Sequence, residues 1–294
     1  MNVNELNSVA MQVRRDVLRM INGAGSGHPG GSLSCTDYIV SLYFSEMNVN
    51  PEKFTMKGEN EDVFYLSNGH VCPALYSVLA RRGYYPVSEL ATLRKFGSRL
   101  QGHPSISHGL PGIRMASGSL GQGLSVAIGH ALAKKLDGDK SIVYSLHGDG
   151  ELQEGQIWEA AMFAAAKKVD NLISAVDYNH QQIDGRVEQV VSLGDLKAKW
   201  ESFGWIVLEC NGNNISEILT VLKKAKSMLF NGKPVMILLH TTMGFGVDFM
   251  LDDCKWHGTA LNDEQLSAAL KQLPETLSTI NLLFNLKLFD DEII

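Results

Sequence analysis

Two residues with oxygen-bearing side chains each follow a short apolar run in this sequence. Asp149 belongs to a Gly148-Asp149-Gly150 turn after residues 141–146, and Asn179 follows residues 171–177. Carboxylate and amide oxygens are ligands that Mg²⁺ prefers, and a bound diphosphate requires such a cation. Glycines on both sides of the carboxylate let the backbone approach phosphate oxygens closely. A Gly-Asp-Gly turn alone is common, but its combination with a following asparagine predicts a metal and diphosphate site.

Four histidines lie beside glycine or proline in turns, where an imidazole is presented rigidly: His28, His70, His103 and His257. Imidazole donates or accepts a proton near neutral pH, and the hydroxyl and carbonyl groups of sugars need such partners. Loop histidines that serve only the backbone are the alternative. Zinc binding is disfavoured because no HExxH or comparable local spacing occurs. His130 falls within a predicted helix and is expected to be structural.

Strands and helices alternate along most of the chain. Apolar runs bounded by turn residues predict strands at residues 62–67, 141–146, 171–177, 205–210 and 234–240. Helical spacing predicts helices at residues 4–22, 34–47, 73–82, 88–96, 125–136, 154–168, 195–203, 215–230 and 262–273. This alternation indicates an α/β fold, a doubly wound parallel sheet with helices on both faces. Ligands bind such sheets beyond the carboxyl ends of the strands, where the glycine turns are expected.

The chain of 294 residues is expected to form one domain over residues 1–273, with a C-terminal tail at 274–294. The net charge of −6 argues against a nucleic-acid or anionic-membrane surface. The first residues do not resemble a signal peptide, and no apolar stretch is long enough to span a bilayer. We therefore expect a cytoplasmic protein with four reduced cysteines.

A glycine-rich segment, Ser117-Gly118-Ser119-Leu120-Gly121-Gln122-Gly123, opens the helix predicted at residues 125–136. Its Gly-x-Gly spacing is superficially that of a dinucleotide-binding turn. Such a turn requires a hydrophobic strand before it, and residues 114–117 are too short and too mixed for one. A nicotinamide site is therefore not expected here.

The motifs together resemble those of transketolases. The resemblance rests on the segments 148–160, 177–179 and 182–185 and extends over about residues 5–272. It is strongest to the N-terminal subunit of those transketolases that are encoded as two polypeptides. It implies thiamine diphosphate and Mg²⁺, or another divalent cation, as cofactors. It also implies three metal ligands: Asp149, Asn179 and the backbone carbonyl of Gln181.

The same resemblance implies further roles for individual residues. Gly148 and Gly150 contact the diphosphate, Gly118 and Leu120 touch the thiamine, and Glu154 matches a glutamate that links cofactor sites across the subunit interface. The four turn histidines match those that line the substrate channel, where His70 and His257 also reach the cofactor.

The resemblance also implies a partner chain. In transketolases the glutamate that activates the cofactor lies in a pyrimidine-binding domain that this sequence is not expected to contain. We therefore expect an α2β2 assembly with a C-terminal partner chain, and sugar phosphates as its substrates. Two departures from the family pattern are Met243, where lysine is usual, and His180, where a smaller residue is common.

The expected reaction is transfer of a two-carbon ketol unit from a ketose phosphate to an aldose phosphate. The alternatives are a transketolase-like subunit for an unusual sugar, the α subunit of a 2-oxoacid dehydrogenase, a deoxyxylulose-phosphate synthase, or a degenerate subunit retained for binding. The 2-oxoacid dehydrogenases lack the histidine turns, and the synthases are normally one long chain. A binding-only role is disfavoured by the intact metal and histidine residues.

Overall fold

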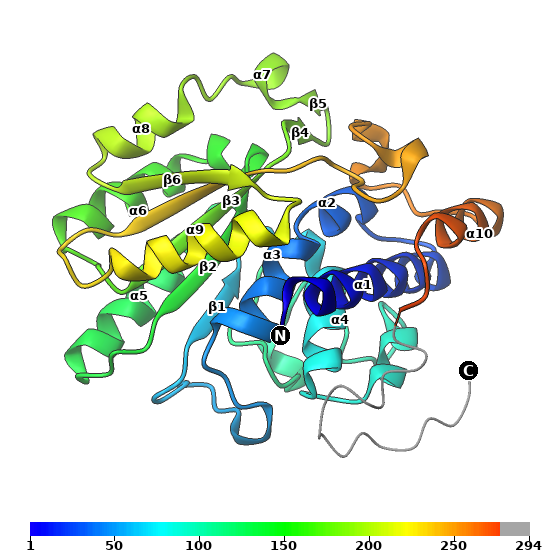
Figure 1. Ribbon diagram of the computed structural model, residues 1–294, viewed down its shortest axis with the longest axis horizontal. Coiled ribbons are helices and arrows are strands. Elements are labelled where there is room, and N and C mark those ends of the chain that lie inside the picture. Colours follow the sequence, from blue (N-terminus) through cyan, green and yellow to red (C-terminus); the bar gives the residue numbers. More distant parts are fainter. Residues whose placement is uncertain (277–294) are drawn as a thin grey trace.

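A single parallel sheet forms the centre of the protein (Figure 1). The computed structural model describes residues 1–276. The five strands have the spatial order β1-β2-β3-β7-β6, and every neighbouring pair is parallel. Their bounds are β1 (Val63–Leu66), β2 (Val143–Gly148), β3 (Leu172–Tyr178), β7 (Val235–His240) and β6 (Ile206–Asn211). All five strands predicted from the sequence are therefore present, with small shifts at their ends.

Ten α-helices connect and cover the strands within the described residues. They are α1 (Val3–Ala24), α2 (Pro29–Ser34), α3 (Thr36–Ser41), α4 (Cys72–Arg82), α5 (Gln122–Leu136), α6 (Gly155–Ala166), α7 (Val187–Val190), α8 (Leu196–Ser202), α9 (Ile215–Ser227) and α10 (Asp263–Gln272). Helices α1, α3, α4 and α9 pack on one face of the sheet, and α5, α6 and α8 pack on the other. The predicted doubly wound α/β architecture is confirmed.

Each strand divides its side chains between the two apolar cores. Tyr144 and Leu146 of β2 belong to the core beneath α1, α4 and α9, whereas Val143 belongs to the core beneath α5 and α6. Side chains alternate across a strand, so a run that is apolar at every position must be covered on both faces. The helices on both sides supply that cover.

Helix α1 has well-defined signals at both ends. Asn2 caps it with a reciprocal capping box to Glu5, and Gly25 ends it with φ 60° in the left-handed region. Gly23 and Ala24 remain helical, so the helix continues slightly past the predicted stop at the glycine cluster. Its buried positions follow the expected spacing, and α10 packs beside it (Figure 1).

The prediction of one helix over residues 34–47 is wrong in detail. The structure has α2, then α3, then a π-helical turn at Leu42–Glu46. Pro29 at the first turn starts α2, and two glycines continue it. Gly30 is required there because a Cβ atom would lie 2.6 Å from Met243 Cγ. The segment predicted at residues 88–96 is likewise only a 3₁₀ helix, Val87–Thr92.

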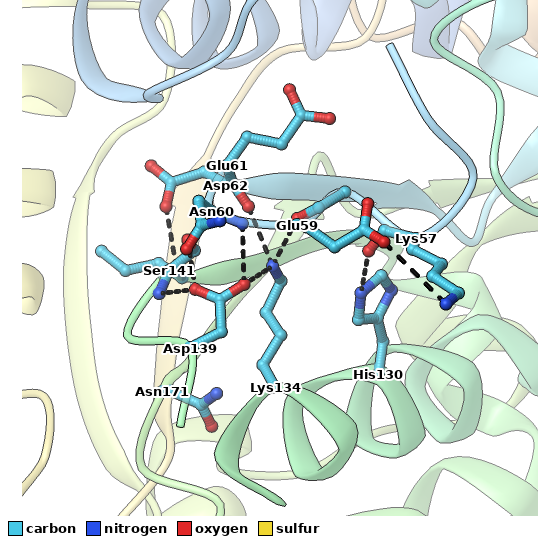
Figure 2. A network of polar contacts seen from close by, with 12 residues as sticks. Lys57, Glu59, Asn60, Glu61, Asp62, His130, Lys134, Asp139, Ser141 and Asn171 are labelled. Carbon is cyan, nitrogen blue, oxygen red and sulfur yellow. Dashed lines mark hydrogen bonds and ion pairs between the residues drawn. The ribbon is translucent and has the colours of Figure 1, made fainter. Parts of the chain in front are cut away.

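A polar network closes the edge of the sheet at the amino ends of the strands (Figure 2). The buried Lys134 ammonium of α5 donates to the carbonyls of Gly58 and Glu61 and to the Asp139 carboxylate, at 2.7, 3.0 and 2.7 Å. His130 contacts the Tyr65 hydroxyl and the Lys57 carbonyl. These contacts agree with the expectation that His130 is structural, which stays a prediction.

The described chain ends shortly after α10. Glu275 forms an ion pair with Arg15, and the Thr276 hydroxyl donates to the Ser8 carbonyl. The remaining residues of the predicted tail, 277–294, lie outside the described part of the chain, so the boundary predicted at residue 273 stays a prediction. No described helix is long and apolar enough to cross a bilayer.

Candidate active site

Asp149 and Asn179 lie beyond the ends of two adjacent strands. Strands β2 and β3 pair in a register that sets Gly148 against Asp177. The Asp149 carboxylate accepts hydrogen bonds from the backbone N–H groups of Gly150, at 2.8 Å, and of His180, at 2.5 Å. The expected adjacency of the two strand ends is therefore present in the structure.

Asn179 is oriented by a second buried carboxylate. Its amide Nδ2 donates to Asp177 Oδ2 at 3.0 Å, and its Oδ1 accepts from the Gln181 backbone N–H at 3.0 Å. Asp177 also accepts from the hydroxyls of Ser34 at 2.6 Å and Thr241 at 2.5 Å. Burial raises the pKa of Asp177 to about 6 despite these bonds. Asp177 thus fixes the amide that the sequence singled out.

Two buried carboxyl groups, those of Asp149 and Asp177, lie close together here without a matching cation. Burial, followed by the nearby Asp177 carboxylate, raises the pKa of Asp149 well above its ordinary value. Within residues 1–276 neither carboxylate forms an ion pair with lysine or arginine. A divalent cation would supply the counter-charge, and a carboxylate, an amide oxygen and a backbone carbonyl are hard oxygen donors that suit Mg²⁺. The residues therefore fit the expected metal.

Clusters of three or more His, Cys, Asp or Glu side chains suited to a metal do not occur in the described residues. The predicted ligand set contains only one side chain of these types, Asp149, together with an amide and the Gln181 carbonyl. Gln181 begins the short hairpin strand β4 (Gln181–Gln182), which pairs with β5 (Gly185–Arg186). Its side chain donates to Asp252 at 2.8 Å, which anchors the hairpin.

The four turn histidines come together although they lie far apart in the sequence. The ring centroid of His28 is 5.0 Å from that of His70, 6.3 Å from that of His103 and 5.6 Å from that of His257. The rings of His70 and His257 are 5.0 Å apart. A set of imidazoles at this spacing surrounds one point and offers several hydrogen-bonding groups to a single small ligand.

These imidazoles are held neutral. Burial lowers the pKa of His28 to about 4, with smaller contributions from His257, Arg94 and His103. Burial also lowers the pKa values of His70, His103 and His257. A neutral imidazole has one donor and one acceptor nitrogen, so at neutral pH the cluster can both donate to and accept from hydroxyl groups.

The glycine-rich segment before α5 closes one side of this cluster. A Cβ atom on Gly118 would lie 3.1 Å from the His103 ring, and one on Gly69 would lie 2.9 Å from the Gly118 nitrogen. Leu120 is partly exposed on the same segment. Residues 114–118 do not form a strand, and α5 begins only at Gln122, which agrees with the argument against a nicotinamide site.

Three buried polar atoms in this region have no partner among the described residues: His28 Nδ1, Asn68 Oδ1 and Ser117 Oγ. Buried polar groups in native proteins are nearly always satisfied, so unpaired atoms that gather in one place indicate a ligand or ordered water. Gly148 lies beside Asn68, since a Cβ atom added to it would meet Asn68 at an ordinary van der Waals distance of 3.8 Å. The atoms therefore fit a polar ligand between the strand ends and the histidines.

Glu151 is a residue of this region that the sequence reasoning missed. Its carboxylate is buried and accepts hydrogen bonds from the Ser67 hydroxyl, the Gly121 N–H at 2.9 Å and the Gly148 N–H at 3.0 Å. It therefore joins the ends of β1 and β2 to the glycine-rich segment. Within the sequence it is one acidic residue in an acidic turn, and only the structure shows its separate partners.

Glu154 has a different position. It is the exposed N-cap residue of α6 and makes no capping hydrogen bond. A Cβ atom on Gly121 would lie 2.9 Å from Glu154 Cβ, so the glycine-rich segment passes directly over it. Gly150 is similarly close to the hairpin, since its added Cβ would be 2.8 Å from Gln182 Cβ. Glu154 thus lies beside the glycine-rich segment, and Gly150 lies beside the hairpin.

Comparison with known proteins agrees with this fold. The family described as transketolase, thiamine diphosphate binding domain, matches residues 6–276. The chain therefore belongs to the transketolase family and corresponds to its thiamine diphosphate binding domain. Two predictions are confirmed at this level: the chain binds thiamine diphosphate, and it is a transketolase-type enzyme subunit.

Two similar chains are subunits with names that specify a sugar. The chain is 41% identical over 269 residues to the 6-deoxy-6-sulfo-D-fructose transketolase subunit of Clostridium sp. (strain MSTE9), covering 92% of this chain and 96% of the relative. It is 39% identical over 280 residues to an apulose-4-phosphate transketolase subunit of Phocaeicola vulgatus, covering 95% and 98%.

A solved structure of transketolase from Campylobacter jejuni superposes with a TM-score of 0.85 and 34% identity. The alignment covers 93% of this chain and 43% of that chain. The present chain therefore spans less than half the length of that chain.

Proposed function

We propose that the chain holds thiamine diphosphate by its diphosphate end through a divalent cation, Mg²⁺. Asp149, the Asn179 side chain and the Gln181 carbonyl would bind the ion, and Gly148, Gly150, Gly118 and Leu120 would contact the cofactor. The buried carboxyl groups of Asp149 and Asp177 at the ends of β2 and β3 have no cationic partner among residues 1–276, and their raised pKa values support a bound cation there.

The proposed reaction is transfer of a two-carbon ketol unit from a ketose phosphate to an aldose phosphate. Thiamine diphosphate, when bound, supplies the nucleophilic ring carbon for this transfer. His103 and His257 would hold substrate oxygens and move protons at them, while His28 and His70 would orient the acceptor. The single observation that carries the proposal is the convergence of four neutral imidazoles, in which the ring centroids of the other three lie within 6.3 Å of that of His28.

A partner chain is part of the proposal. It would supply the pyrimidine-binding domain and the glutamate that activates the cofactor, in an α2β2 assembly in which Glu154 links cofactor sites. Two features support it: the chain spans 43% of the transketolase chain from Campylobacter jejuni, and the relatives from Clostridium and Phocaeicola are named as subunits. The cytoplasmic location and the absence of nucleic-acid and membrane partners stay predictions from the sequence.

A second candidate is ketol transfer with an unusual sugar. The relatives from Clostridium and Phocaeicola are named for a sulfonated fructose and for apulose-4-phosphate. Both names specify a sugar with an anionic group at the end, so the donor proposed here would also carry phosphate or sulfonate. The four histidines of the cluster are neutral, so they suit hydroxyl groups better than an anionic group. They would therefore bind the hydroxyl end of either donor.

The test is a ketol-transfer assay with the coexpressed partner chain, thiamine diphosphate and Mg²⁺. Ketose phosphates and sulfonated ketoses are offered as donors, each with the same aldose phosphate acceptor. Turnover by the pair and none by either chain alone is expected. Full turnover by this chain alone would contradict the partner proposal, and no transfer from any donor by the assembled pair would contradict the reaction.

A further inference from the structure

The Arg94 side chain joins the two turns that carry His28 and His103. Its Nη1 donates to Ser26 Oγ at 2.8 Å, and its Nη2 donates to the Gly102 carbonyl at 3.3 Å. Ser26 lies two positions before His28, and Gly102 directly precedes His103. One planar guanidinium with donors at fixed angles therefore connects two loops that are remote in the sequence.

The local backbone keeps Arg94 in this position. Arg94 has φ 58°, in the left-handed region that side-chain-bearing residues rarely adopt, and its N–H donates to the Leu100 carbonyl at 2.9 Å. A Cβ atom on Gly102 would lie 2.7 Å from Arg94 Cζ. The guanidinium therefore packs directly against the backbone of the second turn, where only glycine leaves room for it.

No carboxylate neutralises this guanidinium among residues 1–276, whereas the nearby Arg99 pairs with Glu89. The charge of Arg94 instead faces the histidines and contributes to the lowered pKa values of His28 and His103. The other titratable groups that face His28 are His257, His103 and the His70 ring. An arginine that only stabilised the surface would be expected to pair with an acidic residue, as Arg99 does.

We propose that Arg94 is a positioning residue of the active site, which sets the separation of the His28 and His103 rings by bridging their two turns. This inference rests on the proposed ketol transfer, because it assigns these imidazoles to one substrate. The ring centroids are 6.3 Å apart, and hydrogen bonds to a reacting group fail when a donor moves by about 1 Å. Arg94 acts through the two histidines and does not itself touch the substrate.

Three variants separate bridging from charge. Arg94→Gln removes both, Arg94→Lys keeps the charge but loses the planar fork, and Gly102→Ala keeps the arginine but displaces its guanidinium. Arg99→Gln is the matched control on the same loop. Circular dichroism and thermal unfolding of each full chain confirm that the variant is folded before it is compared.

The first readout does not need activity. In crystal structures, R94Q, R94K and G102A are expected to change the separation of the His28 and His103 rings, and R99Q is expected to leave it unchanged. In NMR titrations of the histidine rings, the pKa values of His28 and His103 should rise in R94Q and stay low in R94K. An unchanged ring separation in both Arg94 variants would overturn the proposal.

The second readout is kinetics with the partner chain. All three variants are expected to lower kcat by about 10- to 100-fold, with a smaller change in KM. Wild-type kcat in R94K would show that charge alone matters, and this result would reject the bridging role. If the wild-type pair transfers no ketol unit, the proposed function fails, but the ring separation and the titrations still decide the role of Arg94.

Discussion

The Asp149 carboxylate beyond β2 accepts a hydrogen bond from the His180 backbone N–H beyond β3, with the two atoms 2.5 Å apart. His180 has φ 63°, a left-handed conformation that turns this N–H toward the neighbouring strand end. Its side chain lies against Tyr178 and contacts Glu188 at 2.5 Å, which holds the strained residue in place. The family pattern commonly has a smaller residue where this chain has His180. This difference affects the residue whose backbone contacts Asp149 and leaves the predicted metal ligands unchanged.

Replacing Asp149 should separate folding from cofactor binding. In Asp149→Asn the fold is expected to persist, because loss of a buried charge offsets a weaker contact to His180. A ligand at 100 times its Kd stabilises a protein by about 2.7 kcal/mol. We expect thiamine diphosphate and Mg²⁺ to stabilise the assembled wild-type enzyme by this amount in thermal unfolding and to leave the stability of the variant unchanged.

Asp139→Asn is the matched control for that measurement. Asp139 is also an aspartate in a polar network, but it lies at the opposite edge of the sheet, where it contacts Lys134 and Ser141 (Figure 2). This variant should be less stable than the wild type, but thiamine diphosphate and Mg²⁺ should still stabilise it. If the cofactor stabilised Asp149→Asn as much as the wild type, the diphosphate would have to bind elsewhere.

Acid should destabilise the folded chain through His28. The folded pKa is about 4, and the unfolded value is about 6.5. Between pH 4 and pH 6.5 the His28 ring is protonated in the unfolded state but not in the folded state. Protonation of His28 therefore leaves the free energy of unfolding unchanged above pH 6.5 and lowers it as the pH falls toward 4. The loss is up to about 3 kcal/mol, and less to the extent that solvent reaches the partly exposed ring.

The measurement is the free energy of unfolding in urea between pH 4 and pH 6.5. His28→Gln should show a shallower decline than the wild type, because it lacks this proton. His108→Gln, at an exposed position, should follow the wild-type curve. Equal slopes for the wild type and His28→Gln would show that the ring is as free to protonate in the folded state as in the unfolded state.

Glu151→Gln should loosen the glycine-rich segment. The carboxylate has three donors aimed at it, from Ser67, Gly121 and Gly148. A glutamine turns its own N–H₂ toward at least one of them, and loss of a hydrogen bond to a charged group costs about 1.5–3 kcal/mol. Urea unfolding measures this loss, while the exposed Glu159→Gln should change stability by less than about 0.5 kcal/mol. Equal stability of E151Q and E159Q would contradict the role given to Glu151.

The sheet and the strand-end residues could be predicted because they depend on local patterns. Apolar runs at β2 and β3 identify strands, and parallel strands next to each other in the chain commonly pair, so Asp149 and Asn179 were expected to be neighbours. The four histidines were singled out by their glycine turns. Their convergence required the resemblance to a family, because spacing along the chain carries no information about distances between separate loops.

Contacts between distant segments could not be predicted for the same reason. Glu151 and Arg94 are ordinary charged residues in the sequence, and their roles come from partners such as Ser67 and Gly102 that other segments supply. The short helix α2 was missed because two glycines disfavour helix on propensity alone. Tertiary packing decides the conformation there, since the close approach of Met243 to Gly30 excludes a larger side chain.

Two glycines of helix α5 should respond oppositely to alanine. An alanine within a helix normally stabilises by about 0.5–1 kcal/mol relative to glycine. At Gly129 nothing lies within 4 Å of the added Cβ, so Gly129→Ala should show that gain in urea unfolding of the full chain. At Gly123 the added Cβ would lie 2.7 Å from Ser67 Cα, so Gly123→Ala must displace α5 from the end of β1. That shift should lower stability and, because the segment with Gly118 and Leu120 moves too, weaken cofactor binding in the assembled enzyme. A stability gain in both variants would show that the contact between α5 and β1 can relax without cost.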